Sequence, residues 1–251
     1  MSKWVQGTVV GIRHWTDRLF SLQVAAPEVT FVAGQFARLA LPAPPGSQEE
    51  MLGRPYSFAN SPDAAPHEFY VITVAGGPLS PRLAALAPGD PIWLLAQANG
   101  FFSVREVPSA DVLWCLATGT GLGPFLSILR TTEPWEKFRR VVLVHAVREA
   151  SELTYRDEIA GIGAQYPGAF TYVPVVSRED HPEALRGRIP GLIADGRLEA
   201  RTGVALTAES SQVMLCGNPA MIEDTKTVLA ARGMRRHRRR APGQITAEEY
   251  W

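Results

Sequence analysis

The chain has 251 residues, enough for one large domain or two of medium size with a substantial core. Its 25 Lys and Arg residues balance 25 Asp and Glu residues, and this zero formal net charge argues against a generally basic nucleic-acid-binding protein. No run of about 18 apolar residues exists and the N-terminus lacks a signal-peptide pattern. We therefore expect a cytoplasmic protein without a membrane span.

Cysteines and histidines are too few and too scattered to build a metal centre. Cys115 and Cys216 are the two cysteines, and they cannot form a disulfide scaffold, a zinc site or a four-thiolate iron–sulfur cluster. They fit a reducing cytosol. His67, His145 and His181 show no spacing typical of metal ligands, so we expect no metal.

The first hundred residues are predicted to form short strands separated by turns. Five segments are brief, rich in β-branched and aromatic residues and bounded by turn residues: 8–15, 19–26, 35–42, 68–76 and 91–98. One short helix is expected over 79–90. Many short strands at this spacing predict a six-stranded antiparallel β-barrel, which we assign to residues 1–107.

The segment RPYSFANSP, residues 54–62, does not look like an ordinary packing segment. If it is extended, Arg54, Tyr56 and Phe58 lie on one face and Ser57 lies on the other. The segment thus brings a cation, a flat ring and a hydroxyl close together, and this grouping points to a ligand.

The pattern changes near Pro108, where apolar strands begin to alternate with helices. Strands are expected at 112–118, 140–147, 170–177 and 212–217. Helices are expected at 123–130, 151–166 and 219–233, the last capped by Asn218. This alternation predicts a parallel sheet covered on both faces. We assign an α/β domain to residues 108–251, with the boundary somewhere within 103–111.

A glycine-rich segment, LATGTGLGPFLSIL, follows the first predicted α/β strand. Its glycines let the backbone approach a ligand closely, and the helix start offers N–H groups to a pyrophosphate. The alternative is a tight strand-to-helix turn without a ligand. Its position at the carboxyl end of a sheet strand favours nucleotide binding.

Arginines follow successive strands of the same predicted sheet. Arg148 follows the second strand, and Arg178 and Arg188 follow the third. Each one alone is more simply a solvated side chain, but three together favour a shared phosphate ligand, such as the extra phosphate of NADPH. Cys216, in the segment LCGNP, is expected at the same ligand-binding edge.

The C-terminal segment carries an arginine run, residues 235–240, followed by Tyr250 and Trp251. A solvated face is the default interpretation of the run, and a docking patch for an acidic partner is the sharper one. Terminal aromatics fray unless something holds them, so we expect a flat ligand surface against Tyr250 and Trp251.

These motifs resemble the ferredoxin–NADP reductase family when they are taken together. RPYS, GGPLS, TGTGLGP, SR with a following GRIP, and LCGNP occur in this order before an aromatic C-terminus. The resemblance covers essentially the whole chain and is strongest to the bacterial ferredoxin/flavodoxin branch, whose tail is similar to PGQITAEEYW. It implies FAD and NADPH/NADP⁺ as cofactors.

The resemblance implies a role for each motif residue on the flavin side. Arg54 would meet the FAD pyrophosphate, Tyr56 would lie on the isoalloxazine ring and Ser57 would hydrogen-bond near flavin N5. Trp251 would cover the adenine, with Tyr250 beside it. The implied FAD-binding residues are Arg54, Pro55, Tyr56, Ser57, Tyr70, Ile72, Thr73, Gly77, Leu79, Ser80, Thr120, Tyr250 and Trp251.

The resemblance also places NADP(H) on the second half. The implied NADP-binding residues are Arg148, Ser177, Arg178, Arg188, Gly217, Asn218, Pro219 and Met221. Ser57, Thr120 and Cys216 are the implied catalytic residues, with Cys216 near nicotinamide C4. The catalytic glutamate of the plastid enzymes is not assigned to Glu248 or Glu249.

The implied activity is FAD-mediated hydride transfer between NADPH and flavin N5, coupled to one-electron exchange with ferredoxin or flavodoxin. We expect a monomer that binds neither nucleic acid nor a membrane. The alternatives are the reductase component of an oxygenase, a free-flavin reductase, and a non-enzymatic nucleotide- or nucleic-acid-binding regulator that uses the arginine run.

Overall fold

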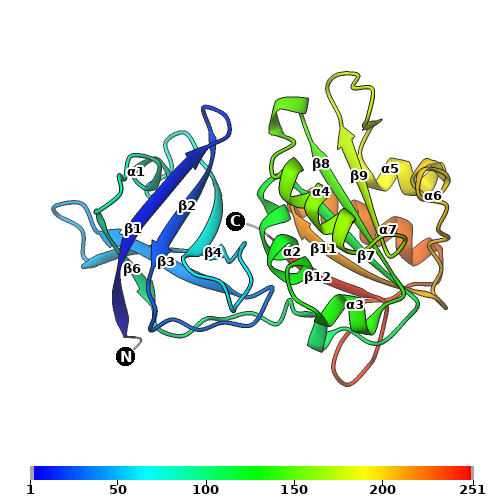
Figure 1. Ribbon diagram of the computed structural model, residues 1–251, viewed down its shortest axis with the longest axis horizontal. Helices are drawn as coiled ribbons and strands as arrows, with labels where there is room; N and C mark the ends of the chain where they lie inside the picture. The colour runs from blue at the N-terminus through cyan, green and yellow to red at the C-terminus, as the bar shows by residue number, and fades with distance from the viewer. Residues whose placement is uncertain (1–2, 250–251) are drawn as a thin grey trace.

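The computed structural model describes residues 3–249, which form two lobes that pack side by side (Figure 1). The first lobe is a sheet of six antiparallel strands in the order β4-β3-β6-β1-β2-β5. An antiparallel bridge between Phe58 and Phe69 links the chain just after β4 to β5. The strands are β1 (Trp4–His14), β2 (Leu19–Ala25), β3 (Phe36–Pro42), β4 (Met51–Ser57), β5 (His67–Ile72) and β6 (Pro91–Leu95). The predicted six-stranded antiparallel lobe is confirmed.

Large apolar side chains fill the interior of this lobe. Phe58 is fully buried and stacks on Phe31 with ring centroids 3.8 Å apart. Tyr56 packs partly against the same cluster, while Arg54 is exposed. The segment Arg54–Ser57 belongs to β4, a strand that lies outside the five predicted ones, and it is extended as the motif required.

The predicted helix 79–90 is much shorter in the structure. α1 spans Ser80–Ala84, with Pro81 in its first turn. The chain leaves the helix at Ala85, and it cannot resume the helix beyond Leu86 because Ala87 precedes Pro88 and so disfavours helical backbone. The Ala87 amide instead donates to the Asp90 carboxylate at 2.8 Å, which forms a turn.

The second lobe is a parallel sheet in the order β10-β9-β8-β7-β11-β12, as the alternating pattern predicted. Its strands are β7 (Val112–Thr118), β8 (Arg140–Val147), β9 (Phe170–Val176), β10 (Leu185–Arg186), β11 (Ser211–Gly217) and β12 (Ile245–Glu249). Its helices are α2 (Leu122–Leu129), α3 (Glu133–Lys137), α4 (Arg156–Gln165), α5 (Ile189–Ala194), α6 (Arg197–Thr202) and α7 (Pro219–Ala231).

Both faces of this sheet are covered, because alternate side chains of its strands point to opposite sides. On one face, Leu113 and Leu143 pack against Phe125 of α2 and Ile159 of α4. On the other face, the sheet packs against α5, α6 and α7 through Leu192, Leu198 and Ile222. The first of these clusters also contains residues of the barrel lobe, so the lobes share one apolar contact.

One predicted helix of this lobe needs correction, and five of its elements were not predicted: β10, β12, α3, α5 and α6. The helix predicted over 151–166 begins only at Arg156. Glu149 and Glu152 form a capping box around a short 3₁₀ turn, and Tyr155 adopts a left-handed backbone with φ of 57°, so the chain is not helical before Arg156. β12 was not predicted, because its sequence ITAEE is polar and lies at the sheet edge.

The assignment of the domains to 1–107 and 108–251 stays a prediction, with β6 ending at Leu95 and β7 beginning at Val112. Over residues 3–249, the structure contains no helix of the length and apolarity needed to span a bilayer.

Candidate functional site

The glycine-rich segment and the LCGNP segment meet at the carboxyl end of the parallel sheet. The Asn218 amide donates to the Thr118 hydroxyl at 2.9 Å, across 100 residues of sequence. A Cβ added to Gly121 would lie 2.4 Å from the Cys216 carbonyl oxygen, and one added to Gly217 would lie 2.1 Å from the Thr118 hydroxyl. Glycine is therefore required at both positions, and the two motifs form one cradle.

The glycine segment is a short 3₁₀ turn, Gly119–Gly121, that leads directly into α2 and contains Thr120. Gly119 has a positive φ of 52° and open space where a Cβ would project. Below it, buried His145 donates from Nε2 to the Gly119 carbonyl at 3.2 Å. Burial lowers the pKa of His145 to about 4, so the imidazole is neutral at pH 7 and supports the turn.

α7 presents its N-terminus to the same edge. The Asn218 side chain accepts hydrogen bonds from the amides of Ala220 at 3.0 Å and Met221 at 3.3 Å, and Pro219 occupies the first turn. The predicted cap is confirmed. Because capping occupies the Asn218 side-chain oxygen, the side chain keeps only its NH₂ group for a ligand.

The turns that follow β8 and β9 lie side by side at this edge. The Arg178 amide donates to the Arg148 carbonyl at 3.0 Å, and the Ser177 amide donates to Val147 at 3.1 Å. Arg188 stands just before α5. Three arginines predicted from sequence are therefore brought to neighbouring turns.

These three arginines differ from others of the same lobe. The guanidinium groups of Arg148, Arg178 and Arg188 are exposed and make no ion pair with any residue between 3 and 249. Three other exposed arginines of the lobe are instead paired with carboxylates: Arg156 with Glu183, Arg186 with Asp180, and Arg197 with Asp195. The unpaired set is available for an anion.

The barrel contributes the end of β4 to the site. Ser57 is 5% exposed, and its hydroxyl lies 3.5 Å from Oε1 of Glu248, at the outer limit of a hydrogen bond. Tyr56 is half-buried, and burial raises its pKa to about 12, so the phenol stays protonated. The Arg54 guanidinium is exposed and, among the described residues, donates only to the adjacent Gly53 carbonyl at 2.8 Å.

Glu248 belongs to this site, although the sequence analysis assigned it no role. Parallel pairing of β12 with β11 places Glu248 opposite Cys216 and Glu249 opposite Gly217. Burial raises the pKa of Glu248 to about 7, and the Ser57 hydroxyl opposes this rise. The signal that could have identified it is a parallel edge strand that follows the arginine run.

The remaining predicted flavin residues occupy β5 and the turn after it. Ile72 is half-buried. The Thr73 amide donates to the backbone carbonyl of Arg18 at 2.7 Å, and the Gly77 amide donates to the backbone carbonyl of Val74 at 2.9 Å. The neighbouring Gly76 has open space at its Cβ position. This turn presents exposed backbone beside the barrel.

Three of those residues turn their side chains elsewhere. Leu79 is buried in the barrel core, and the Ser80 hydroxyl accepts a hydrogen bond from the Val74 amide at 2.9 Å. Tyr70 is 4% exposed, and its hydroxyl accepts a hydrogen bond from Thr154 at 2.9 Å. Tyr70 and Leu79 would therefore contact a flavin through backbone atoms. Tyr250 and Trp251 lie outside the described residues.

The arginine run forms a loop next to Glu248. A cavity of about 530 Å³ is lined by this loop, by Phe101 and by Glu248 itself. Arg239 makes a two-point contact with Glu106 at 2.9 Å and lies over the Phe101 ring, 4.9 Å from its centroid. Phe101 is 72% exposed, which is unusual for so large an apolar side chain.

Comparisons with known proteins agree with this arrangement. A family model described as an oxidoreductase NAD-binding domain matches residues 115–227. The flavodoxin/ferredoxin–NADP reductase of Escherichia coli (strain K12) is 48% identical over 252 residues, covering 100% of both chains. The ferredoxin–NADP reductase of Pseudomonas aeruginosa is 34% identical, covering 94% of this chain and 92% of that protein.

A solved structure extends the agreement to the fold. The ferredoxin NADP⁺ reductase from Neisseria gonorrhoeae, crystallised with bound FAD and NADP, superposes with a TM-score of 0.92. It is 33% identical, and the match covers 99% of each chain. The resemblance read from the motifs is confirmed: this chain belongs to the flavodoxin/ferredoxin–NADP reductase family.

Proposed function

We propose that this protein binds FAD between its lobes and exchanges electrons between NADP(H) and a ferredoxin or flavodoxin. The bound flavin would supply the chemistry, because it accepts a hydride from NADPH and releases electrons one at a time. The observation that carries the proposal is the meeting of Ser57, at the end of a barrel strand, with the carboxyl ends of β7, β11 and β12.

The barrel residues fit a flavin dinucleotide. The Arg54 guanidinium is exposed and has no carboxylate partner among the described residues, so it is free to bind the pyrophosphate of FAD. Tyr56 offers a neutral ring, and Ser57 offers a buried hydroxyl. The turn over 74–80 adds backbone groups. Together these groups match the anionic, planar and polar parts of FAD.

The second lobe fits a phosphorylated dinucleotide. Gly121 and Gly217 let the two motifs pack closely, and Gly119 has open space where a Cβ would project, so its backbone can approach a ligand. The unpaired Arg148, Arg178 and Arg188 lie on neighbouring turns, and such a set would favour NADP(H) over NAD(H) by binding the 2′-phosphate. Cys216, buried beside the cradle, would shape the nicotinamide pocket without acting as a nucleophile.

The arginine run is the proposed docking surface for the electron carrier. Arg236, Arg238 and Arg240 make no ion pair with the described residues, and exposed Phe101 lies beside Arg239. A cationic rim around an apolar centre suits an acidic carrier and steers its approach. We also propose that the protein works as a cytoplasmic monomer, independent of nucleic acid and membrane.

The test is reduction of purified ferredoxin and flavodoxin by the purified protein with NADPH, and with NADH as control. We expect a yellow protein with flavin absorbance, faster reduction with NADPH, and a rate that falls as salt rises. A colourless protein that retains no flavin would overturn the proposal. Salt-dependent RNA binding by such a protein would favour the regulator instead.

A further inference from the structure

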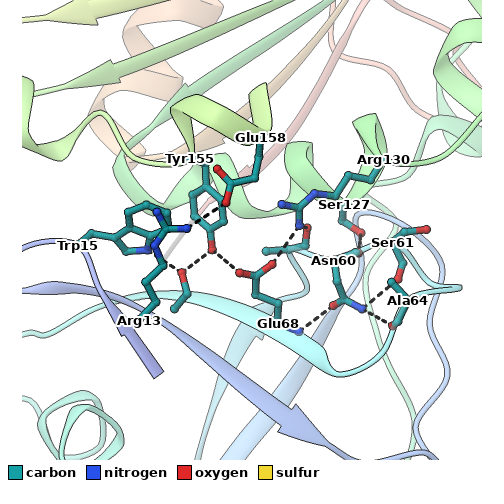
Figure 2. Close-up of polar contacts among 12 residues, drawn as sticks. Arg13, Trp15, Asn60, Ser61, Ala64, Glu68, Ser127, Arg130, Tyr155 and Glu158 are labelled. Atoms are coloured by element: carbon teal, nitrogen blue, oxygen red, sulfur yellow. Dashed lines mark hydrogen bonds and ion pairs between the residues drawn. The ribbon is translucent and has the colours of Figure 1, made fainter. Parts of the chain in front are cut away.

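A polar junction joins the two lobes beside the proposed redox site (Figure 2). We propose that Thr154 and Tyr155, on the turn before α4, are positioning residues that fix the second lobe on the barrel and so set the separation of the two redox rings. This inference rests on the proposed function. The junction residues are Ser21, Asn60, Glu68 and Tyr70 from the first lobe and Ser127, Arg130, Thr154 and Tyr155 from the second.

Tyr155 reaches from the second lobe into the barrel. It is 1% exposed, and its hydroxyl lies 2.5 Å from the Ser21 hydroxyl and donates to Oε1 of Glu68 at 3.1 Å. The centroid of its ring lies 4.6 Å from that of Trp15 and 5.3 Å from that of Tyr70, which it meets edge-on. One phenol therefore holds strands β2 and β5 to the second lobe.

The backbone at Tyr155 is unusual. Its φ of 57° is the one positive value at a non-glycine residue within 3–249. Such a conformation is disfavoured for a bulky residue and persists only where the surroundings impose it. It comes immediately before α4 begins at Arg156, in the turn that sends the tyrosine ring to the barrel.

Thr154 connects the same turn to the redox site. Its hydroxyl donates to the Tyr70 hydroxyl at 2.9 Å. A Cβ placed on Gly123, at the start of α2, would lie 3.8 Å from Cβ of Tyr70 and 4.0 Å from the Ser57 carbonyl oxygen. Gly123 thus lies close to both Tyr70 and Ser57, so a shift of Tyr70 can be passed to Ser57 through the start of α2.

The other end of the turn leads to the proposed phosphate site. Oε2 of Glu152 accepts hydrogen bonds from the amides of Arg148 at 2.9 Å and Glu149 at 3.3 Å. The Ala150 amide donates to Glu179 at 2.5 Å. The segment 148–155 is therefore a braced turn with an NADP-facing arginine at one end and the lobe contact at the other.

Other contacts keep the lobes together when a single hydroxyl is removed. Arg130 pairs with Glu68 at 3.0 Å and donates to the Ala59 carbonyl at 2.8 Å. The Ser127 hydroxyl donates to the Asn60 carbonyl at 2.7 Å. Thr154→Val and Tyr155→Phe should therefore fold and change the fit of the lobes.

The experiment compares Thr154→Val and Tyr155→Phe with Tyr172→Phe. Tyr172 is a matched control because its buried hydroxyl has no partner among the described residues. We expect flavin reduction by NADPH in single turnovers to slow about tenfold in the two junction variants, because small misplacements of reacting groups are costly. FAD content and the Kd for NADP⁺ should stay within about twofold of wild type. Tyr172→Phe should match wild type.

Two further readouts separate positioning from simple stability. Hydrogen exchange should lose protection over 19–25 and 67–72 in both junction variants, and Thr154→Ser should restore the reduction rate. Unchanged rates in Thr154→Val and Tyr155→Phe would overturn the inference, as would rates that fall only with FAD loss. If wild-type protein is not reduced by NADPH, the proposed function itself fails.

Discussion

Two regions of the second lobe differ: a closed end that packs against the barrel, and an open end at the carboxyl edge of the parallel sheet. At the closed end, Glu68 and Arg130 pair at 3.0 Å with side chains 15% and 23% exposed, and the Tyr155 hydroxyl completes the contact. At the open end, Arg178 and Arg188 have exposed guanidinium groups with no ion pair among the described residues.

This difference in burial and pairing distinguishes charged groups that stabilise the fold from charged groups that are available to a ligand. A charge that is removed from water needs a partner, since burial of an unpaired charge is costly. An arginine that binds a phosphate ligand is instead solvated and free of a carboxylate partner when the ligand is absent. Ser57 and Glu248 lie between these extremes, because their contact is buried but long, at 3.5 Å.

The largest effect is expected at the open end, in the variant Arg178→Ala with Arg188→Ala. The preference for NADPH over NADH, measured as a ratio of kcat/KM values, should fall about a hundredfold, because two charge-assisted contacts to the 2′-phosphate are lost. The NADH value should change little.

Arg186→Ala with Arg197→Ala is the matched control, since both arginines are already paired with carboxylates. If this control alters the coenzyme preference as much as the first variant, the contrast between paired and unpaired arginines has no functional meaning.

The closed end should respond in stability instead. Arg130→Ala leaves the Glu68 carboxylate poorly exposed and without its cation, and we expect the free energy of unfolding to fall by about 2 kcal/mol. Arg178→Ala should stay within about 0.5 kcal/mol of wild type. Urea denaturation measures both, and equal losses would contradict the division.

The fold was largely predictable because each lobe has its own local pattern. The strands at 112–118 and 140–147 are continuous apolar runs, and β7 and β8 have those bounds. The helix before Gln165 was predicted too long, because the left-handed backbone of Tyr155 depends on contacts with the barrel that local propensity does not encode.

The site was predictable where a motif has its own chemistry, as in the glycine segment and the arginines after successive strands. Glu248 and Thr154 could not be found this way. Glu248 reaches Ser57 only through the parallel pairing of β12, and Thr154 reaches Tyr70 only through the packing of the lobes. Both contacts join residues far apart in sequence, 191 and 84 positions respectively.

At the intermediate contact, Ser57→Ala should slow flavin reduction by NADPH about tenfold while FAD remains bound, because an orienting hydroxyl is lost and the packing is kept. Stopped-flow absorbance measures the rate. Ser61→Ala, four residues further along, is the control and should behave as wild type. A wild-type rate in Ser57→Ala would remove this serine from the catalytic set.

The smallest effect is expected from the pH dependence of Glu248. Burial raises its pKa to about 7, above the ordinary value of 4.5, so the folded state binds more protons than the unfolded state between these values. Its contribution to stability is therefore greatest at low pH and is lost as the pH rises through about 7. Between pH 6 and pH 7 the loss should be about 1 kcal/mol.

Glu248→Gln isolates this term from the opposite contribution of His145. The pKa of His145 is lowered to about 4 from its ordinary value of 6.5, so the stability that His145 contributes rises with pH between these two values and is constant above them. Because the variant keeps His145, the difference between the unfolding free energies of the two proteins reports on Glu248 alone. The wild type should lose stability relative to Glu248→Gln as the pH rises. A difference that is constant from pH 5 to pH 7 would mean that Glu248 is ionised throughout, and its carboxylate would then resemble the charged groups of the open end and not those of the closed end.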